Sequence, residues 1–217
     1  MKNFTSFSYM KKLLPACFLL IFMLAAQAQV PVVSGGLGQT NANPNNGANG
    51  GAASGLGCGG GGANFYGGNG GDGLYGGGGG GAAGLNAINM IGGNGGQGVL
   101  VVAFYNGASY LNTIVYQNGT SLTVGALANS VKVWAIGAGG GGAGSTANDG
   151  TVGGGGGAGG VAYITKTVIP GENITYSLGT GGTGGIDASN GNNGSSTTAI
   201  VGGTTYYCRR RCRRRIQ

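Results

Sequence analysis

Histidine is absent from this chain of 217 residues, and acidic side chains are few. Charged residues make up 7% of the sequence, where an ordinary domain has about 25%. The four acids are Asp72, Asp149, Glu172 and Asp187. They lie too far apart in the sequence to nominate a catalytic pair, and no base is present to activate a serine or threonine. We therefore expect a protein that is not an enzyme and that binds no cofactor.

Proline is scarce as well, with 4 residues, whereas glycine contributes 56 residues, all of them after position 34. Interrupted glycine triplets with so little proline exclude collagen. The chain is 41% hydrophobic with few charges, which also differs from the usual composition of disordered proteins. This composition indicates a structural or binding module.

Cysteine is too rare and too poorly placed to form a metal centre. Beyond the N-terminal segment the chain has Cys58, Cys208 and Cys212, an odd number without histidine partners. Arginines flank the last two cysteines and would repel a cation. We expect no metal site, and a disulfide between Cys58 and one of the other two cysteines stays open.

The N-terminus has the features of a secretory signal peptide. Lysines at positions 2, 11 and 12 precede an apolar run over residues 13–26, which is short for a membrane span. Ala26-Gln27-Ala28 supplies the small residues of a cleavage site, so we expect cleavage between Ala28 and Gln29. The mature protein is then secreted or held at the cell surface, without stable membrane insertion.

Positive charge is confined to the C-terminus. Residues 29–207 carry Lys132 and Lys166 against the four acids, which gives 2 − 4 = −2, whereas six arginines follow Tyr207. Since no basic face exists outside this tail, we expect no nucleic-acid partner.

Short β-prone segments dominate the chain from residue 99 onward. We expect strands over residues 99–105, 111–116, 121–124, 131–136, 161–169 and 174–178, separated by turn signals such as Asn106-Gly107 and Pro170-Gly171. No segment after the signal peptide favours a helix. Within residues 130–136 hydrophobic side chains occur on both faces, so both faces of that strand should be covered. The predicted fold class is an all-β framework with glycine-rich tracts.

Glycine recurs at every third position in two tracts of related sequence. It stands at positions 67, 70, 73, 76 and 79, and again at 92, 95 and 98. A period of three matches the threefold extended helix of the polyproline II or polyglycine II type, in which bare edges let neighbouring backbones touch. Ordering a residue costs about 1–2 kcal/mol and a hydrogen bond returns about 0.5–1.5 kcal/mol net. Such tracts therefore need to pack side by side, with strands fixing their ends.

One G-x-G-x-x-G motif follows a predicted strand at Gly137, Gly139 and Gly142. A dinucleotide site needs a helix directly after these glycines and an acid about 20 residues further on. The glycine run over residues 140–160 cannot propagate a helix, so we interpret the motif as part of a glycine tract.

The order of elements in the second half resembles the glycine-rich domain of phage tail-fibre and adhesin proteins, which also occurs in secreted bacterial surface proteins. The resemblance rests on SVKVWAIGA at residues 130–138, on Pro170-Gly171-Glu172, and on YSLGTGG at residues 176–182. It implies a β framework that carries glycine-rich loops or polyglycine II helices for surface display or recognition. The resulting division of the chain is a signal peptide at 1–28, a flexible Gly/Asn-rich arm at 29–64, the closing part of one glycine-rich unit at 65–105, the β-rich opening part of a second at 106–207, and a tail at 208–217.

Aromatic residues are the best candidates for contact with a ligand. Phe65, Tyr66 and Tyr75 lie within glycine tracts, where little core exists to bury them, so either core packing or exposed recognition suits them. For the aromatics on strands, Tyr110, Tyr116, Trp134, Tyr163 and Tyr176, we expect core packing.

The tail reads Cys-Arg-Arg-Arg-Cys-Arg-Arg-Arg over residues 208–215, a pattern without a physical rationale. Written with TGC and CGG codons and read one base later, the same DNA encodes Ala-Gly-Gly-Gly-Ala-Gly-Gly. We therefore predict that the tail is out of frame and that the in-frame chain continues as a glycine tract. A genuine arginine tail would instead bind an anionic surface.

Taken as a sequence, the chain is predicted to be a structural or adhesive module at the cell surface. The alternative is a ligand-specific binding protein, recognising carbohydrate or ice, that presents Asn, Thr and aromatic residues on a glycine-rich face. Extracellular polysaccharide or protein is the expected partner class, and self-association stays open.

Overall fold

The computed structural model describes residues 36, 52, 59–63, 67–84, 89–146 and 152–208. The predicted signal peptide with Ala28 and Gln29, most of the arm at 29–64, Phe65, Tyr66, and the tail from Arg209 onward lie outside these residues. The described part of the chain is all β, as predicted, and contains no helix. Consequently it offers no helical segment that could cross a membrane.

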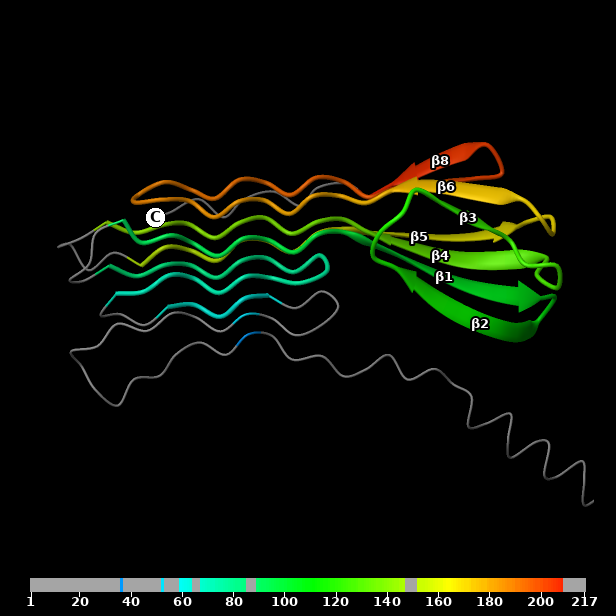
Figure 1. Ribbon diagram of the computed structural model, residues 1–217, viewed down its shortest axis with the longest axis horizontal. Helices are drawn as coiled ribbons and strands as arrows, with labels where there is room; N and C mark the ends of the chain where they lie inside the picture. The colour runs from blue at the N-terminus through cyan, green and yellow to red at the C-terminus, as the bar shows by residue number, and fades with distance from the viewer. Residues whose placement is uncertain are drawn as a thin grey trace, which may run out of the picture. The chain divides into compact units, whose positions relative to one another are not determined.

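Eight strands form two antiparallel four-stranded sheets (Figure 1). The strand order is β2-β1-β4-β5 in the first sheet and β3-β6-β7-β8 in the second. The strands are β1 (Val99–Asn106), β2 (Ser109–Tyr116), β3 (Ser121–Thr123), β4 (Ser130–Ile136), β5 (Val161–Thr167), β6 (Asn173–Ser177), β7 (Thr198–Val201) and β8 (Thr204–Tyr207). The boundary that the sequence predicts between two glycine-rich units, at residues 105 and 106, falls at the end of β1. β1, which lies before this boundary, pairs with β4, which lies after it.

The six predicted strands are present, whereas β7 and β8 were not predicted. Each of these two strands has only 4 residues, too few for alternation to stand out beside a glycine tract. They form a hairpin closed by Gly202 and Gly203, whose φ angles of 56° and 70° suit glycine.

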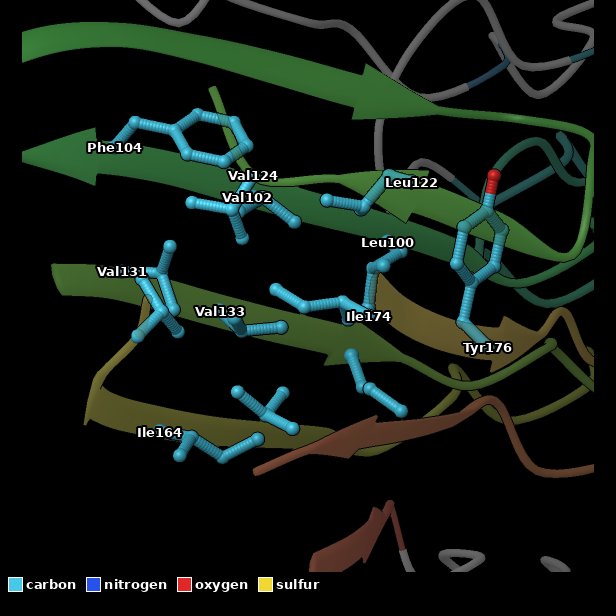
Figure 2. Packing of buried hydrophobic residues seen from close by; sticks show 14 of the residues in the cluster. Leu100, Val102, Phe104, Leu122, Val124, Val131, Val133, Ile164, Ile174 and Tyr176 are labelled. Carbon is cyan, nitrogen blue, oxygen red and sulfur yellow. The ribbon is translucent and has the colours of Figure 1, made fainter. Parts of the chain in front are cut away.

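The hydrophobic core lies between the two sheets (Figure 2). Leu100, Val102 and Phe104 of β1 alternate toward it, and so do Val131 and Val133 of β4. From the second sheet come Ile174 and Tyr176 of β6 and Val201 of β7. Alternate residues of each strand therefore form the core, as the period-two pattern predicts.

The other face of β4 is only partly covered, contrary to the prediction that both faces are buried. Lys132, Trp134 and Ile136 are half-buried there. Trp134 lies opposite Tyr163 of β5, with ring centroids 5.2 Å apart, and the Ile136 side chain lies beside Gly76.

Glycine-rich tracts continue directly from the strands and run side by side (Figure 1). We number them along the chain: tract 1 (59–63), tract 2 (67–75), tract 3 (76–84), tract 4 (91–98), tract 5 (137–145), tract 6 (152–160), tract 7 (178–186) and tract 8 (189–197). Tract 4 leads into β1, tract 6 into β5 and tract 8 into β7, while β4 leads into tract 5 and β6 into tract 7. The strands thus fix the ends of the tracts, as the energetic argument requires.

Tract 5 has the hydrogen-bond pattern of a threefold helix. Its amides at positions 137, 140 and 143 donate to tract 6, and those at 138, 141 and 144 donate to tract 8. Those at 139 and 142 donate to tract 4, and that at 145 donates to Met90, directly before tract 4. Each third residue therefore faces the same neighbour, which is the symmetry of an extended helix with 3 residues per turn. The predicted polyglycine II type of packing is the structure of this bundle.

The packing leaves no space for side chains at the inner positions. A Cβ atom added at Gly139 would lie 2.0 Å from the carbonyl oxygen of Gly77, and one at Gly142 would lie 2.0 Å from that of Gly80. At Gly154, on the outside of tract 6, a Cβ atom would meet no atom of the described residues within 4 Å. Glycine is thus required by the approach of bare backbones rather than by a positive φ.

Candidate functional site

Side chains gather on one face of the tract bundle at every third residue. Three positions from each of tracts 2, 4, 7 and 8 form what we call the side-chain grid, and each of them is exposed or half-buried. The grid consists of Asn69, Asp72 and Tyr75; Ile91, Asn94 and Gln97; Thr180, Thr183 and Ile186; and Ser189, Asn192 and Ser195. Since the tracts rise about 3.1 Å per residue, successive rows of the grid are about 9 Å apart.

Hydrogen bonds join the grid residues across the tracts. In the middle row the Asp72 carboxylate accepts from the backbone N–H of Asn94 at 2.7 Å, and the Asn94 side chain accepts from the N–H of Gly184 at 3.0 Å. The Asn192 amide then donates to the Thr183 hydroxyl at 2.7 Å. These side chains satisfy backbone groups that would otherwise face solvent, so they are held in fixed positions.

The flanking rows are bonded in the same manner. In the outer row, Asn69 accepts from the N–H of Ile91 at 2.8 Å and Ser189 from the N–H of Ile186 at 2.9 Å. In the row nearest the sheets, the hydroxyls of Thr180 and Ser195 lie 3.1 Å apart. The two related motifs at 67–73 and 92–98 therefore place Asn69 and Asn94 in equivalent roles.

Tyr75 is the one predicted recognition residue that the structure describes; Phe65 and Tyr66 lie outside the described residues. It is half-buried, with φ at 43°, in the turn between tracts 2 and 3. Its hydroxyl donates to the Gln117 side chain at 2.9 Å, and the Gln97 amide donates to the Gln117 carbonyl at 3.0 Å. A positive φ is costly for a large side chain, so this contact with the sheet end is held by the surrounding structure. Its part in recognition stays a prediction.

A second surface is the outer face of the first sheet, which carries several aromatic residues. Tyr105 and Tyr110 form an edge-to-face pair with centroids 5.7 Å apart, and Trp134 stacks beside Tyr163. The Lys132 ammonium lies 4.9 Å from the centroid of the Tyr105 ring. We call these five residues the aromatic face.

The aromatic face corrects part of the prediction for the strand aromatics. Tyr176 is buried and Tyr116 packs against the core, as expected. Tyr163 and Tyr110 are 56% and 40% exposed, however, and Trp134 is half-buried on the outer face. The alternation of residues in β4 could have predicted the position of Trp134, because Trp134 points to the side opposite Val131 and Val133, which face the core.

The described residues offer no cluster of acidic or cysteine side chains that could hold a metal ion. Gly137, Gly139 and Gly142 of the dinucleotide-like motif are spaced along tract 5, and no helix follows them in the described part of the chain. Cys208 is a buried free thiol, so it takes no part in the disulfide that the sequence left open; Cys58 and Cys212 are not described.

Comparison with known proteins gives one finding for this region. Residues 115–210 match a protein family described as a glycine-rich domain. The match runs from the end of β2 through tracts 5–8 to β8. Neither the curated proteins nor the solved structures contain a match to the chain.

Proposed function

We propose that this protein is a non-enzymatic glycine-rich structural or adhesive module that acts outside the cell or at its surface. The observation that supports this best is the bundle of glycine tracts, which are joined by backbone hydrogen bonds and continue into the strands of two sheets. Such a scaffold holds surface side chains without further ordering on contact, which lowers the entropic cost of binding. The predicted signal peptide and the resemblance to tail-fibre and adhesin domains favour the same role.

Adhesion can be tested by comparing single and multivalent display. The mature chain should bind polysaccharide-coated or cell-derived surfaces when it is arrayed on beads, and lose most of that binding as a dilute monomer, because an adhesive module acts through avidity. Undiminished binding by the dilute monomer would move the assignment to a ligand-specific binding protein. Absence of binding in both formats would contradict adhesion.

The second candidate function is specific binding of carbohydrate or ice, and two surfaces favour it. The side-chain grid presents mostly polar groups at regular spacing, and the aromatic face presents rings that are exposed or half-buried. Recognition residues on a rigid platform are typical of binding proteins.

Trp134 provides a direct readout for carbohydrate, since the chain has 1 tryptophan. A sugar bound at the aromatic face should change the fluorescence emission of Trp134. Tyr163→Ala should weaken the sugar binding measured in this way by about 1–3 kcal/mol.

The ice-binding alternative is tested on the grid. Thr183→Val should reduce ice binding or the inhibition of ice growth, and Thr175→Val, at an exposed position on β6, is the matched control. Equal effects of the two threonine variants would remove the grid from consideration.

A further inference from the structure

Each of the two sheets has two edge strands, and three of these four edges have features that oppose pairing with another chain. β3 has 3 residues and β8 has 4, so neither offers a long ladder. β5 carries Lys166, whose Cε atom lies 3.2 Å from the place that a Cβ atom on Gly202 would take, in the turn between β7 and β8. Short strands, edge lysines and covering segments all keep sheet edges apart.

β2 is the fourth edge, and it has none of these three features. It is the outermost strand of the first sheet (Figure 1) and has 8 residues. Its residues 109–115 are all exposed, including Ile114 at 39% and Val115 at 38%. No charged residue and no proline occurs between Asp72 and Lys132. An uncharged, exposed edge of this length is a template for a further strand.

A bulge limits the part of β2 that can accept another strand. The register of β1 and β2 shifts between Phe104 and Tyr105, and Leu111 is the extra residue on β2. Bulges bend the strand and disturb the ladder locally. The regular part of the edge is therefore residues 112–116, which we call the open edge.

The backbone of the open edge directs alternate residues away from β1. The Tyr105 carbonyl accepts from the Asn129 N–H on the β4 side of β1, so every second residue of β1, counted from Tyr105, directs its backbone groups toward β4. Thr113 and Val115 lie opposite two residues of this set. Their N–H and C=O groups therefore point to the outer side of β2, where no backbone group of the described residues bonds them.

These outward groups match those of a second copy in one antiparallel register. When the register is centred on Ile114, Thr113 of each chain lies opposite Val115 of the other, and both residues direct their backbone groups toward each other. Ile114 then lies opposite itself, on the side of the sheet that Val102 shares with the core. The pairing uses residues 112–116 of both chains and ends before the bulge.

We infer that this protein forms a symmetric dimer in which the open edges of two copies pair, so that their first sheets become one continuous sheet. The contact is isologous, with a twofold axis perpendicular to the sheet at Ile114. Both aromatic faces then lie on the same side of the joined sheet. The inference rests on the sheet edge and not on the proposed function.

Charge and side-chain chemistry favour a second copy as the occupant. The open edge brings no charge to face its own copy, and residues 29–207 carry a net charge of only −2, so repulsion between copies is weak. Pairs of β-branched residues on neighbouring strands, here Thr113 with Val115 and Ile114 with Ile114, are each worth about 0.2–1 kcal/mol. A strand with lysine or glutamate at these positions would lose these contacts.

Sedimentation of the mature chain, residues 29–217, measures the association. The wild type should change from monomer to dimer as its concentration rises, with a Kd of about 1–100 μM, because the contact is small. Ile114→Lys and Ile114→Glu each place two like charges opposite each other at the axis. Each variant alone should therefore dimerise about tenfold more weakly or worse.

A mixture of the two variants tests the register. Lysine faces glutamate only if position 114 lies opposite itself, so mixing the Ile114→Lys and Ile114→Glu chains should restore the dimer. Val161→Lys is the matched control, because Val161 is a 60% exposed valine on the other edge strand of the same sheet. It should dimerise as the wild type does.

The urea midpoint of each variant shows whether its fold is intact. Thr113→Lys, on the opposite face of β2, should also weaken the dimer, and it serves as the test if substitution of Ile114 disturbs folding. A wild-type chain that stays monomeric at about 200 μM, or equal weakening by Val161→Lys, would overturn the dimer. Failure of two folded Ile114 variants to associate when mixed would overturn the pairing of the open edges.

Discussion

At the scale of single residues, the effect of replacing a glycine in the tracts depends on where the new Cβ atom would point, rather than on the local backbone conformation. Gly154 and Gly156 stand two positions apart in tract 6. A Cβ atom at Gly156 would lie 2.1 Å from the Gly140 carbonyl oxygen, whereas one at Gly154 would meet no described atom within 4 Å. The same substitution should therefore have opposite effects at these two sites.

Gly156→Ala should lower the free energy of unfolding by about 1–3 kcal/mol, since a methyl group there forces tracts 5 and 6 apart. Gly154→Ala should leave it unchanged or raise it by about 0.4–1 kcal/mol, because alanine restricts the unfolded chain. Urea titration of both variants measures the difference. Equal destabilisation would contradict the close approach of the tracts.

Two tyrosines at the edge of the core give the protein a sensitivity to alkaline pH. Burial raises the pKa of Tyr176 above its ordinary value of 10.0, and burial together with the neighbouring Tyr176 raises the pKa of Tyr116. The Tyr176 hydroxyl also donates to the Asn118 carbonyl at 2.8 Å. Above pH 10 the unfolded chain therefore binds fewer protons than the folded one, and stability falls as pH rises.

The urea midpoint should consequently be flat below about pH 9 and fall as the pH rises above about 10. Tyr116→Phe should make this fall shallower, because the ionising group is gone. Tyr207→Phe, at a tyrosine that is 55% exposed, is the control, and its urea midpoint should fall with pH as steeply as that of the wild type. A variant series with one common slope would show that other groups cause the alkaline loss.

At the scale of elements, strands and tracts are continuous pieces of chain, so the core of the sheets also positions the bundle. Tract 4 enters β1 at Val99, and tract 5 leaves β4 at Ile136, directly opposite in the register. Isolated glycine tracts return too little free energy to stay ordered. The hydrophobic core therefore contributes part of the stabilisation of the bundle.

Leu100→Ala should lower the free energy of unfolding by about 2–5 kcal/mol, as expected for a fully buried side chain. It should also accelerate amide exchange in tracts 4 and 5, where no side chain has changed. Leu127→Ala, at a leucine that is 71% exposed, should stay within about 0.5 kcal/mol of the wild type. Faster exchange confined to the strands would show that the bundle is stable without the core.

The strands other than β7 and β8 and the threefold glycine period could be predicted from the sequence, because each depends on residues that are neighbours in the chain. The side-chain grid could not be predicted, since Asp72, Asn94 and Thr183 come together only through the order in which tracts 2, 4 and 7 pack. The aromatic face could be predicted in part. The sequence shows that Val133 and Trp134 point to opposite sides of β4, but which side is exposed depends on where the second sheet packs.

At the scale of the whole molecule, the composition changes from glycine and asparagine to β-prone residues at Val99. Residues 34–62 have almost no hydrophobic side chains to bury, so the N-terminal arm should be cut first in limited proteolysis. Fragments should begin before tract 1 (59–63), which is hydrogen-bonded to tracts 2 and 3, and should retain residues 99–136 intact. Early cleavage inside residues 99–136 would contradict this order of stability.

The most direct test of the threefold bundle is site-resolved amide exchange along tract 6. The amides of Gly153, Gly156 and Gly159 donate to tract 3, and the residues between them are more exposed. The account predicts slow exchange at these three positions and fast exchange at Gly154, Gly155 and Gly157. Protection at every second residue, at all residues or at none would contradict it, since these patterns belong to a strand, a continuous helix and an unordered chain.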